Sequence, residues 1–177
     1  MGKKLILLSG VHGVGKSYFL NNRFACDDRF EILSASSLIG KFKKADDAGY
    51  KKVYDVQNNQ QVLLTVLLEE KNRISKDIIL DGHICILNET GKVECISEKF
   101  FLDAGVNGVI LLQDDVNIIV QRQGQRDGLV LDQSIIKEMQ EKEKQYCERL
   151  FSKYNIGHHV IDDTCDYSKF CKIVDGL

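Results

Sequence analysis

Residues 10–17 read G-V-H-G-V-G-K-S and match the phosphate-loop pattern G-x-x-x-x-G-K-[ST] at every specified position. An apolar run at residues 4–8 precedes this stretch, and a helix-compatible segment at residues 16–22 continues from it. In this order of strand, glycine turn and helix, backbone N–H groups turn inward around phosphate oxygens at the positive end of a helix dipole. The stretch therefore predicts a nucleoside triphosphate site at the first strand of the fold.

The residue types of the motif suit the two cofactors that it predicts, ATP and Mg²⁺. Lys16 is expected to reach the β- and γ-phosphates, and the Ser17 hydroxyl is expected to ligate Mg²⁺. The loop and the first turn of the helix are together predicted to bind the nucleotide; these residues are Gly10, Val11, His12, Gly13, Val14, Gly15, Lys16, Ser17 and Tyr18.

Length and charge limit the class of protein. The chain has 177 residues and a net charge of −2, which suits one domain spanning residues 1–177 and does not indicate binding to nucleic acid or to a membrane surface. No apolar run approaches the roughly 18 to 20 residues that a membrane-spanning helix needs. The apolar residues near the N-terminus run straight into the phosphate loop, so they indicate a first strand rather than a signal peptide. These features predict a cytoplasmic protein.

Cysteines are spread along the chain without a C-x-x-C pair. They are Cys26, Cys85, Cys95, Cys147, Cys165 and Cys171. Since no secretory signal is recognisable, reduced thiols are the expected state. Cys85 and Cys95 are spaced so that they can face each other across a hairpin.

Aliphatic runs alternate with helix-compatible runs along the chain. The predicted strands lie at residues 4–9, 30–34, 77–80, 109–112 and 159–162. The predicted helices lie at residues 16–24, 57–73, 115–123, 133–153 and 167–174. Several of the strands are continuously apolar, which is typical of strands buried on both faces of a parallel sheet. The predicted fold class is α/β, a three-layer αβα sandwich of the P-loop NTPase type with a mainly parallel five-stranded sheet.

Two segments interrupt this alternation. Residues 34–54 are polar and lysine-rich, and we expect them to be irregular. Residues 84–96 hold two short apolar runs on either side of the sequence N-E-T-G, which predicts a small β-hairpin insertion. Ligands of open α/β sheets bind beyond the carboxyl ends of the strands, and both segments follow a strand. Both are therefore expected to reach the site.

An aliphatic strand at residues 78–80 ends in Asp81. After a phosphate loop, a carboxylate in this position holds Mg²⁺ directly or through water. The alternative is an aspartate that starts a turn with Gly82. His83 follows at once, and three roles are open to it: contact with substrate, proton transfer, or packing within the turn.

Arg122 and Arg126 are spaced i,i+4 at the end of a predicted helix. The forked donors of arginine match the oxygens of a phosphoryl group in transfer, which favours a catalytic role. Cations also complement the C-terminus of a helix, and the spacing fits that interpretation equally well.

Four features follow one another along the chain: the phosphate loop, the strand ending in Asp-Gly, the R-x-x-x-R pair and a last strand ending near Asp-x-Thr. In this order they resemble nucleoside monophosphate kinases, and more narrowly the archaeal-type adenylate-kinase-like proteins. The resemblance implies that Asp81 organises Mg²⁺ and its waters, while Gly10, Gly13, Gly15, Lys16 and Ser17 bind the ATP phosphates and Mg²⁺. It also implies that Arg122 lies over the adenine ring and that Arg126 is a lid arginine that contacts the transferring phosphate. The loop at residues 162–164, with Asp163 and Thr164, is implied to cradle adenine.

The sequence departs from that family mainly in the half that would hold the phosphate acceptor. Bacterial-type members follow Asp-Gly with Phe-Pro-Arg, whereas here residues 81–85 read D-G-H-I-C. No arginine lies between Arg29 and Arg73, where the family offers one; only lysines and the Ser36-Ser37 pair are available. In the loop itself, His12 stands where many members have proline.

Two functions are compatible with these residues. The first is an ATP-dependent small-molecule kinase that transfers the γ-phosphate of ATP·Mg to a nucleotide or related acceptor, which enters between residues 34–54 and 81–96. Lys16, Asp81, Arg122 and Arg126 would carry the chemistry. The alternative is an ATP-hydrolysing switch or assembly factor that acts on a protein or ribonucleoprotein partner, which the missing acceptor arginines and the hairpin favour.

Overall fold

A parallel sheet forms the centre of the computed structural model, which describes residues 2–24, 28–45, 56–88, 90–126 and 131–177. Its strands are β1 (Leu5–Ser9), β2 (Phe30–Ser34), β3 (Asp77–Asp81), β6 (Gly108–Leu112) and β7 (Gly157–Ile161). They lie in the order β2-β3-β1-β6-β7, and every neighbouring pair is parallel. The predicted α/β fold class is confirmed.

Burial on both faces explains the continuously apolar strands. All residues of β1 and β6 are buried. Along β1, Leu5 and Leu7 pack into one hydrophobic cluster, while Ile6 and Leu8 pack into a second cluster on the opposite face. Because successive side chains of a strand point to opposite faces, a strand covered on both sides needs apolar residues at every position.

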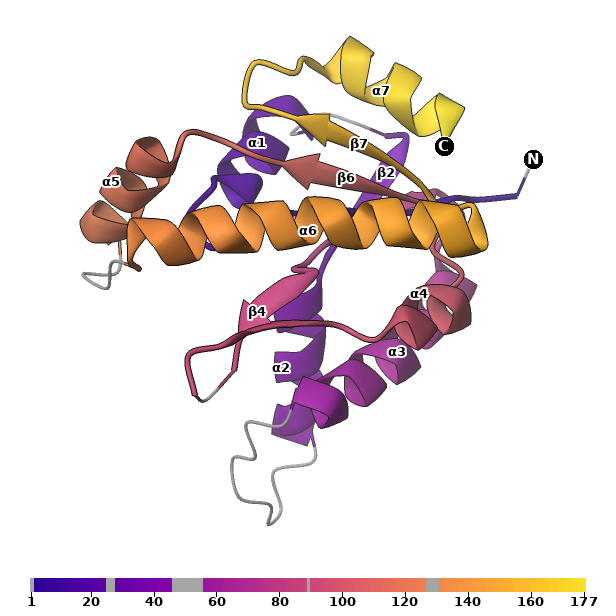
Figure 1. Cartoon of the computed structure of the whole chain (residues 1–177). Helices are drawn as coiled ribbons and strands as arrows, with labels where there is room; N and C mark the ends of the chain where they lie inside the picture. Colours follow the sequence, from indigo (N-terminus) through magenta and orange to yellow (C-terminus); the bar gives the residue numbers. More distant parts are fainter. Residues whose placement is uncertain (1, 25–27, 46–55, 89, 127–130) are drawn as a thin grey trace.

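Helices cover both faces of the sheet (Figure 1). They are α1 (Lys16–Phe24), α2 (Ala35–Ala45), α3 (Val56–Arg73), α4 (Glu98–Ala104), α5 (Val116–Arg126), α6 (Gln133–Tyr154) and α7 (Tyr167–Gly176). Figure 1 shows α1 and α7 on one side and α2, α3 and α4 on the other, with α6 crossing in front. The long helix α6 contributes Met139 to the cluster beneath α1 and α7, and Leu150 to the cluster beneath α3 and α4.

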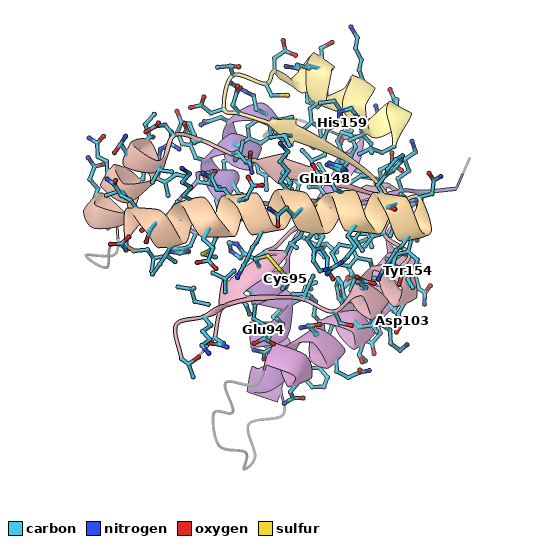
Figure 2. All side chains as sticks on the ribbon, in the orientation of Figure 1. Glu94, Cys95, Asp103, Glu148, Tyr154 and His159 are labelled. Carbon is cyan, nitrogen blue, oxygen red and sulfur yellow. A yellow bond between two sulfur atoms is a disulfide. The ribbon has the colours of Figure 1, made fainter. Side chains whose placement is uncertain are left out.

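The predicted hairpin is present as β4 (Cys85–Leu87) and β5 (Val93–Cys95). The Asn88 side chain closes its turn, because Asn88 Oδ1 accepts hydrogen bonds from the backbone N–H groups of Thr90 and Lys92. A disulfide joins Cys85 to Cys95 across the hairpin (Figure 2). The expectation of reduced thiols is therefore wrong for this pair; Cys147, Cys165 and Cys171 are free.

Two helices were not predicted from the sequence. The segment expected to be irregular, residues 34–54, begins with helix α2; residues 46–55 lie outside the described part. Adjacent apolar residues at Leu38 and Ile39 give α2 a face toward the core, and this tertiary contact outweighs the polar composition. The seven-residue helix α4 is fixed at its ends by Ser97, whose side chain accepts from Lys99 N–H, and by Gly105 in the left-handed conformation at φ 65°.

Within the described ranges, none of the helices combines the length and apolarity required to cross a membrane.

Candidate active site

The site lies at the carboxyl edge of the sheet, where β3 and β6 flank β1 on opposite sides. Ligands of open α/β sheets bind at such a point, because the loops leaving the two neighbouring strands diverge there. A cavity of about 740 Å³ opens at this edge. It is lined by the phosphate loop, by the turn after β3, and by residues of α2, α3, α5 and the hairpin region.

Close contacts explain the glycines of the loop. A Cβ atom on Gly10 would lie 2.4 Å from the carbonyl oxygen of Leu112 at the end of β6. Gly13 has φ +85°, and its Cβ would lie 2.6 Å from Cγ of Gln123 on α5. Between them Val11 is buried, and its carbonyl accepts from Val14 N–H at 3.2 Å. The loop is therefore held between β6 and α5, and α1 begins at Lys16 directly behind it.

Lys16 is only 8% exposed and its ammonium group lies inside the loop. Lys16 Nζ donates to the carbonyl oxygen of Gly10 at 3.1 Å and lies 3.8 Å from Asp81 Oδ1. Burial raises the pKa of Asp81, and the positive charge of Lys16 opposes that rise with a smaller effect. Lys16 and Asp81, predicted from separate motifs, are thus neighbours in the structure.

His83 lies against Lys16 rather than packing only within its own turn. Its Nδ1 is 2.7 Å from the carbonyl oxygen of Gly10, and both ring nitrogens lie 3.4 Å from Lys16 Nζ. Since a carbonyl oxygen only accepts, Nδ1 carries the proton and Nε2 keeps its lone pair. Burial, with a smaller contribution from the Lys16 charge, lowers the pKa of His83 to about 3. The imidazole is therefore neutral near neutral pH and can accept a hydrogen bond from Lys16.

Ser17 and Asp81, the two residues predicted to hold Mg²⁺, line the same cavity. A hydroxyl and a carboxylate are the hard oxygen donors that Mg²⁺ prefers. The register of the sheet places Asp81 beside Leu8, next to the start of the phosphate loop. Ser17, at the second position of α1, is exposed. The residue types at this edge therefore fit an Mg²⁺ ion.

Arg122 is hydrogen-bonded to the phosphate loop from outside it. Its Nη1 donates to the carbonyl oxygen of Val14 at 2.7 Å and to Asp114 Oδ2 at 2.8 Å. Its Nη2 lies 3.5 Å from Asp163 Oδ2, which brings two of the predicted nucleotide-binding residues together. Thr164 donates from its backbone N–H and its hydroxyl to Asp162, and neither Asp163 nor Thr164 is among the residues that line the cavity. The Arg126 side chain lies outside the described residues.

A family model described as an AAA domain matches residues 9–138 of the chain. The chain belongs to this AAA-domain family. No curated protein sequence matches it.

Solved structures with a similar fold include the tunicamycin resistance protein of Deinococcus radiodurans, at 13% identity and a TM-score of 0.55, over 87% of this chain and 96% of that one. A gluconokinase from Sinorhizobium meliloti 1021 matches at 14% identity and a TM-score of 0.47, over 97% of this chain and 87% of that one. At such identities the likeness concerns the fold, which is the P-loop NTPase-like fold that the strand order shows.

Two buried polar residues support the phosphate loop and were not identified from the sequence. Gln123, 1% exposed, donates from Nε2 to the carbonyl oxygen of His12 at 2.7 Å. Glu143, fully buried on α6, accepts from Ser9 Oγ at 2.7 Å, and that hydroxyl accepts from Ile84 N–H at 2.9 Å. Burial raises the pKa of Glu143 to about 7. The sequence does hold a signal for Gln123 and Glu143, because each is a polar residue that interrupts the apolar stripe of a helix.

The other half of the cavity is built from α2, α3 and the hairpin region of the AAA domain. The polar residues that line it are Ser34, Ser36, Asn59 and Gln60. The apolar residues that line it are Ala35, Ile39, Leu63, Ile86 and Ile96. Both sequence segments expected to reach the site, residues 34–54 and 84–96, thus contribute to it. The side chains of Lys43, Lys44, Lys51 and Lys52 lie outside the described part.

Proposed function

We propose that the protein is an ATP-dependent small-molecule kinase, which transfers the γ-phosphate of ATP·Mg to an acceptor bound in the same cavity. The observation that carries this proposal is the continuity of the cavity. It runs from Arg122 and the phosphate loop, past Asp81, to Ile96 behind the hairpin. Its volume of about 740 Å³ lies within the range of sites that enclose small ligands. A site for the triphosphate alone would not need the second half.

In the proposed reaction, this chain contributes positioning and charge. Lys16 leaves the carbonyl oxygen of Gly10 and donates to the β- and γ-phosphates, while neutral His83 accepts from it and limits its movement. Ser17 and Asp81 would hold Mg²⁺, which when bound neutralises charge on the phosphate oxygens. Bound on two sides, the phosphates need little reorganisation during transfer.

The base end of ATP is proposed to lie at Arg122. Its guanidinium group is held in place by Val14 and Asp114, and Asp163 lies beside it. A planar cation fixed by such contacts can stack on an adenine ring. This arrangement supports the adenylate-kinase-like role of Arg122 with Asp163 beside it. The roles of Thr164 beside adenine and of Arg126 as the lid arginine are proposed from the sequence resemblance alone.

The kinase proposal is tested by acceptor-dependent ADP formation. We expect ADP release from ATP·Mg to rise when the correct acceptor is added to a metabolite panel. Lys16→Ala should lower that rate by about 10²–10³-fold, because one preorganised donor to the transferring group is lost. Lys99→Ala is the matched control, since Lys99 is 76% exposed on α4 and pairs with Asp103. Full activity of Lys16→Ala would show that the loop is not the site.

A second candidate is an ATP-driven switch that acts on a protein partner. The disulfide-linked hairpin beside the cavity favours it, because a partner could sense the nucleotide through this element. A pull-down with and without ATP separates the candidates. A partner retained only with ATP, together with no phosphorylated small product, would favour the switch over the kinase.

A further inference from the structure

We propose that Gln123 and Arg122 of α5 are positioning residues for the triphosphate. Each holds one carbonyl group of the phosphate loop toward α5, so that the N–H groups of Gly13 and Gly15 point at the phosphate oxygens. This inference rests on the ATP binding of the proposed function, and it names the side chains that prepare the loop for that binding.

Gln123 fixes the peptide that joins His12 to Gly13. Its Nε2 donates to the carbonyl oxygen of His12 at 2.7 Å, and its Oε1 accepts from Leu131 N–H at 3.0 Å. Since a backbone N–H only donates and a carbonyl oxygen only accepts, one orientation of the Gln123 amide satisfies both contacts. The loop has no cis peptide bond, and in a planar trans peptide the C=O and N–H groups point in opposite directions. Gly13 N–H is therefore turned away from Gln123.

Arg122 fixes the peptide that joins Val14 to Gly15 in the same way. Its Nη1 donates to the carbonyl oxygen of Val14 at 2.7 Å and to Asp114 Oδ2 at 2.8 Å. Gly15 N–H is thereby turned away from the guanidinium group. Between the two peptides, Val14 N–H donates to the carbonyl oxygen of Val11 at 3.2 Å. Alternate N–H groups of the loop are thus turned away from α5, and the one between them is used within the loop.

The cavity lies on the side to which the two glycine N–H groups are turned. Gly13, Gly15 and Lys16 line the cavity. Gln123 is 1% exposed and packs behind the loop, where a Cβ atom on Gly13 would lie 2.6 Å from its Cγ. N–H groups that converge in a glycine turn at the start of a helix form a concave anion site. The phosphates that Lys16 is expected to bind are therefore the acceptors that these N–H groups face.

Glycine is the reason that the loop needs such positioning. Gly13 has φ +85° and Gly15 has φ +105°, and glycine exchanges between backbone conformations at little cost. A flip of either peptide would turn a carbonyl oxygen toward the phosphates in place of a donor. The contact with Gln123 opposes the first flip, because its buried Nε2 would lose its acceptor. Donors that are already oriented need no reorganisation when the phosphate binds.

Gln123→Met tests the inference, because methionine has a similar length and lacks the donor. Calorimetric titration compares tripolyphosphate with Mg²⁺, ADP·Mg and adenosine. We expect the affinity for both phosphate ligands to fall by about tenfold to a hundredfold, since a hydrogen bond to a charged group is weakened. The affinity for adenosine should stay unchanged. Gln121→Met is the matched control, because Gln121 is exposed on the same helix.

Two outcomes of these titrations would overturn the inference. One is an unchanged affinity of Gln123→Met for tripolyphosphate, and the other is an equal loss of affinity for adenosine. Gln123→Asn keeps an amide but shortens the side chain by one methylene group. It should show the same selective loss, and it decides the question if Gln123→Met does not fold.

The sequence allows the two glycine N–H groups to be observed singly. His12-Gly13 is the one His-Gly pair of the chain, and Val14-Gly15 is the one Val-Gly pair. Isotopic labelling of the carbonyl carbon of His, or of Val, together with the nitrogen of Gly therefore gives a single NMR correlation peak for each. In the wild type, both amide protons should move downfield when tripolyphosphate binds, because each donates to an anionic oxygen.

The two variants should have crossed effects on these peaks. In Gln123→Met the shift of Gly13 should shrink while that of Gly15 is kept, and Arg122→Met should do the reverse. A merely structural role would change both peaks together, and that result would overturn the inference. So would amide protons that do not move in the phosphate-bound wild type. Failure of the wild type to bind ADP·Mg and tripolyphosphate would instead contradict the proposed function, and the inference with it.

Discussion

Glu143→Gln offers the most direct test of the electrostatics beneath the phosphate loop. Glu143 lies fully buried on α6 and accepts a hydrogen bond from Ser9 at the end of β1. Through Ser9 it is linked to Ile84, just after the turn that carries His83. Glutamine keeps the size and the accepting oxygen of glutamate but does not titrate. The substitution therefore removes the charge and retains the link.

The size of the expected change in folding stability follows from the raised pKa of Glu143. Burial moves the pKa of Glu143 from 4.5 to about 7 in the folded protein. As pH rises, the unfolded chain releases the Glu143 proton first. The contribution of protonated Glu143 to folding stability is therefore fully present below pH 4.5 and is lost progressively between pH 4.5 and about pH 7. The ionised carboxylate then costs about 3 kcal/mol relative to the acidic limit. Between about pH 5 and about pH 8 the loss is about 2.5 kcal/mol.

Urea unfolding of the wild type and of Glu143→Gln at these two pH values measures the effect. The variant should gain stability relative to the wild type by about 2.5 kcal/mol on going from about pH 5 to about pH 8. Other titrating groups contribute equally to both proteins and cancel in the difference. Glu148→Gln, at an exposed position of the same helix, is the matched control for the substitution itself. A flat difference between the wild type and Glu143→Gln would refute the assigned pKa and its cause.

Three further variants test the phosphate loop, helix α2 and the hairpin. Gly13→Ala would place a methyl group 2.6 Å from Gln123 at φ +85°, and should cost about 1–2 kcal/mol of stability and weaken ATP binding. Gly40→Ala on α2, where no atom lies within 4 Å of the new Cβ, should instead stabilise by about 0.5–1 kcal/mol in urea unfolding. Cys85→Ser/Cys95→Ser opens a loop with a sequence separation of 10, which should cost about 2.7 kcal/mol in unfolding without reductant. Free thiols at both positions in the mass spectrum of the native wild type would contradict the disulfide.

The parts of the fold that could be predicted are those with a local signal. Continuous aliphatic runs predicted the central strands nearly to the residue; the strand expected at residues 4–9, for example, is β1 at Leu5–Ser9. Helix α2 lacked such a signal, because its core contacts come from few apolar residues, such as Leu38. Helix α4 is short, and its stability depends on Phe101, which is fully buried among residues of distant segments. Tertiary packing, not local propensity, determines both helices.

The candidate site also has a part that a local motif predicts and a part that only tertiary packing determines. The phosphate loop is one contiguous motif, so its geometry, from Gly10 to Lys16, could be anticipated. Gln123 and Glu143 support that loop from helices more than a hundred residues away in sequence, and a pattern within the motif cannot reveal them. Each could have been noticed only as a polar residue on an apolar helix stripe, which indicates a buried contact but not its partner.

The acceptor half depends entirely on assembly of distant segments, and this explains why the sequence left the acceptor open. Ser36, Asn59 and Ile96 meet only because α2, α3 and the hairpin pack on one side of the sheet. Missing arginines could suggest a weakened monophosphate site or a switch. The identity of the acceptor is therefore set by the assembled wall of the cavity and not by any one contiguous motif.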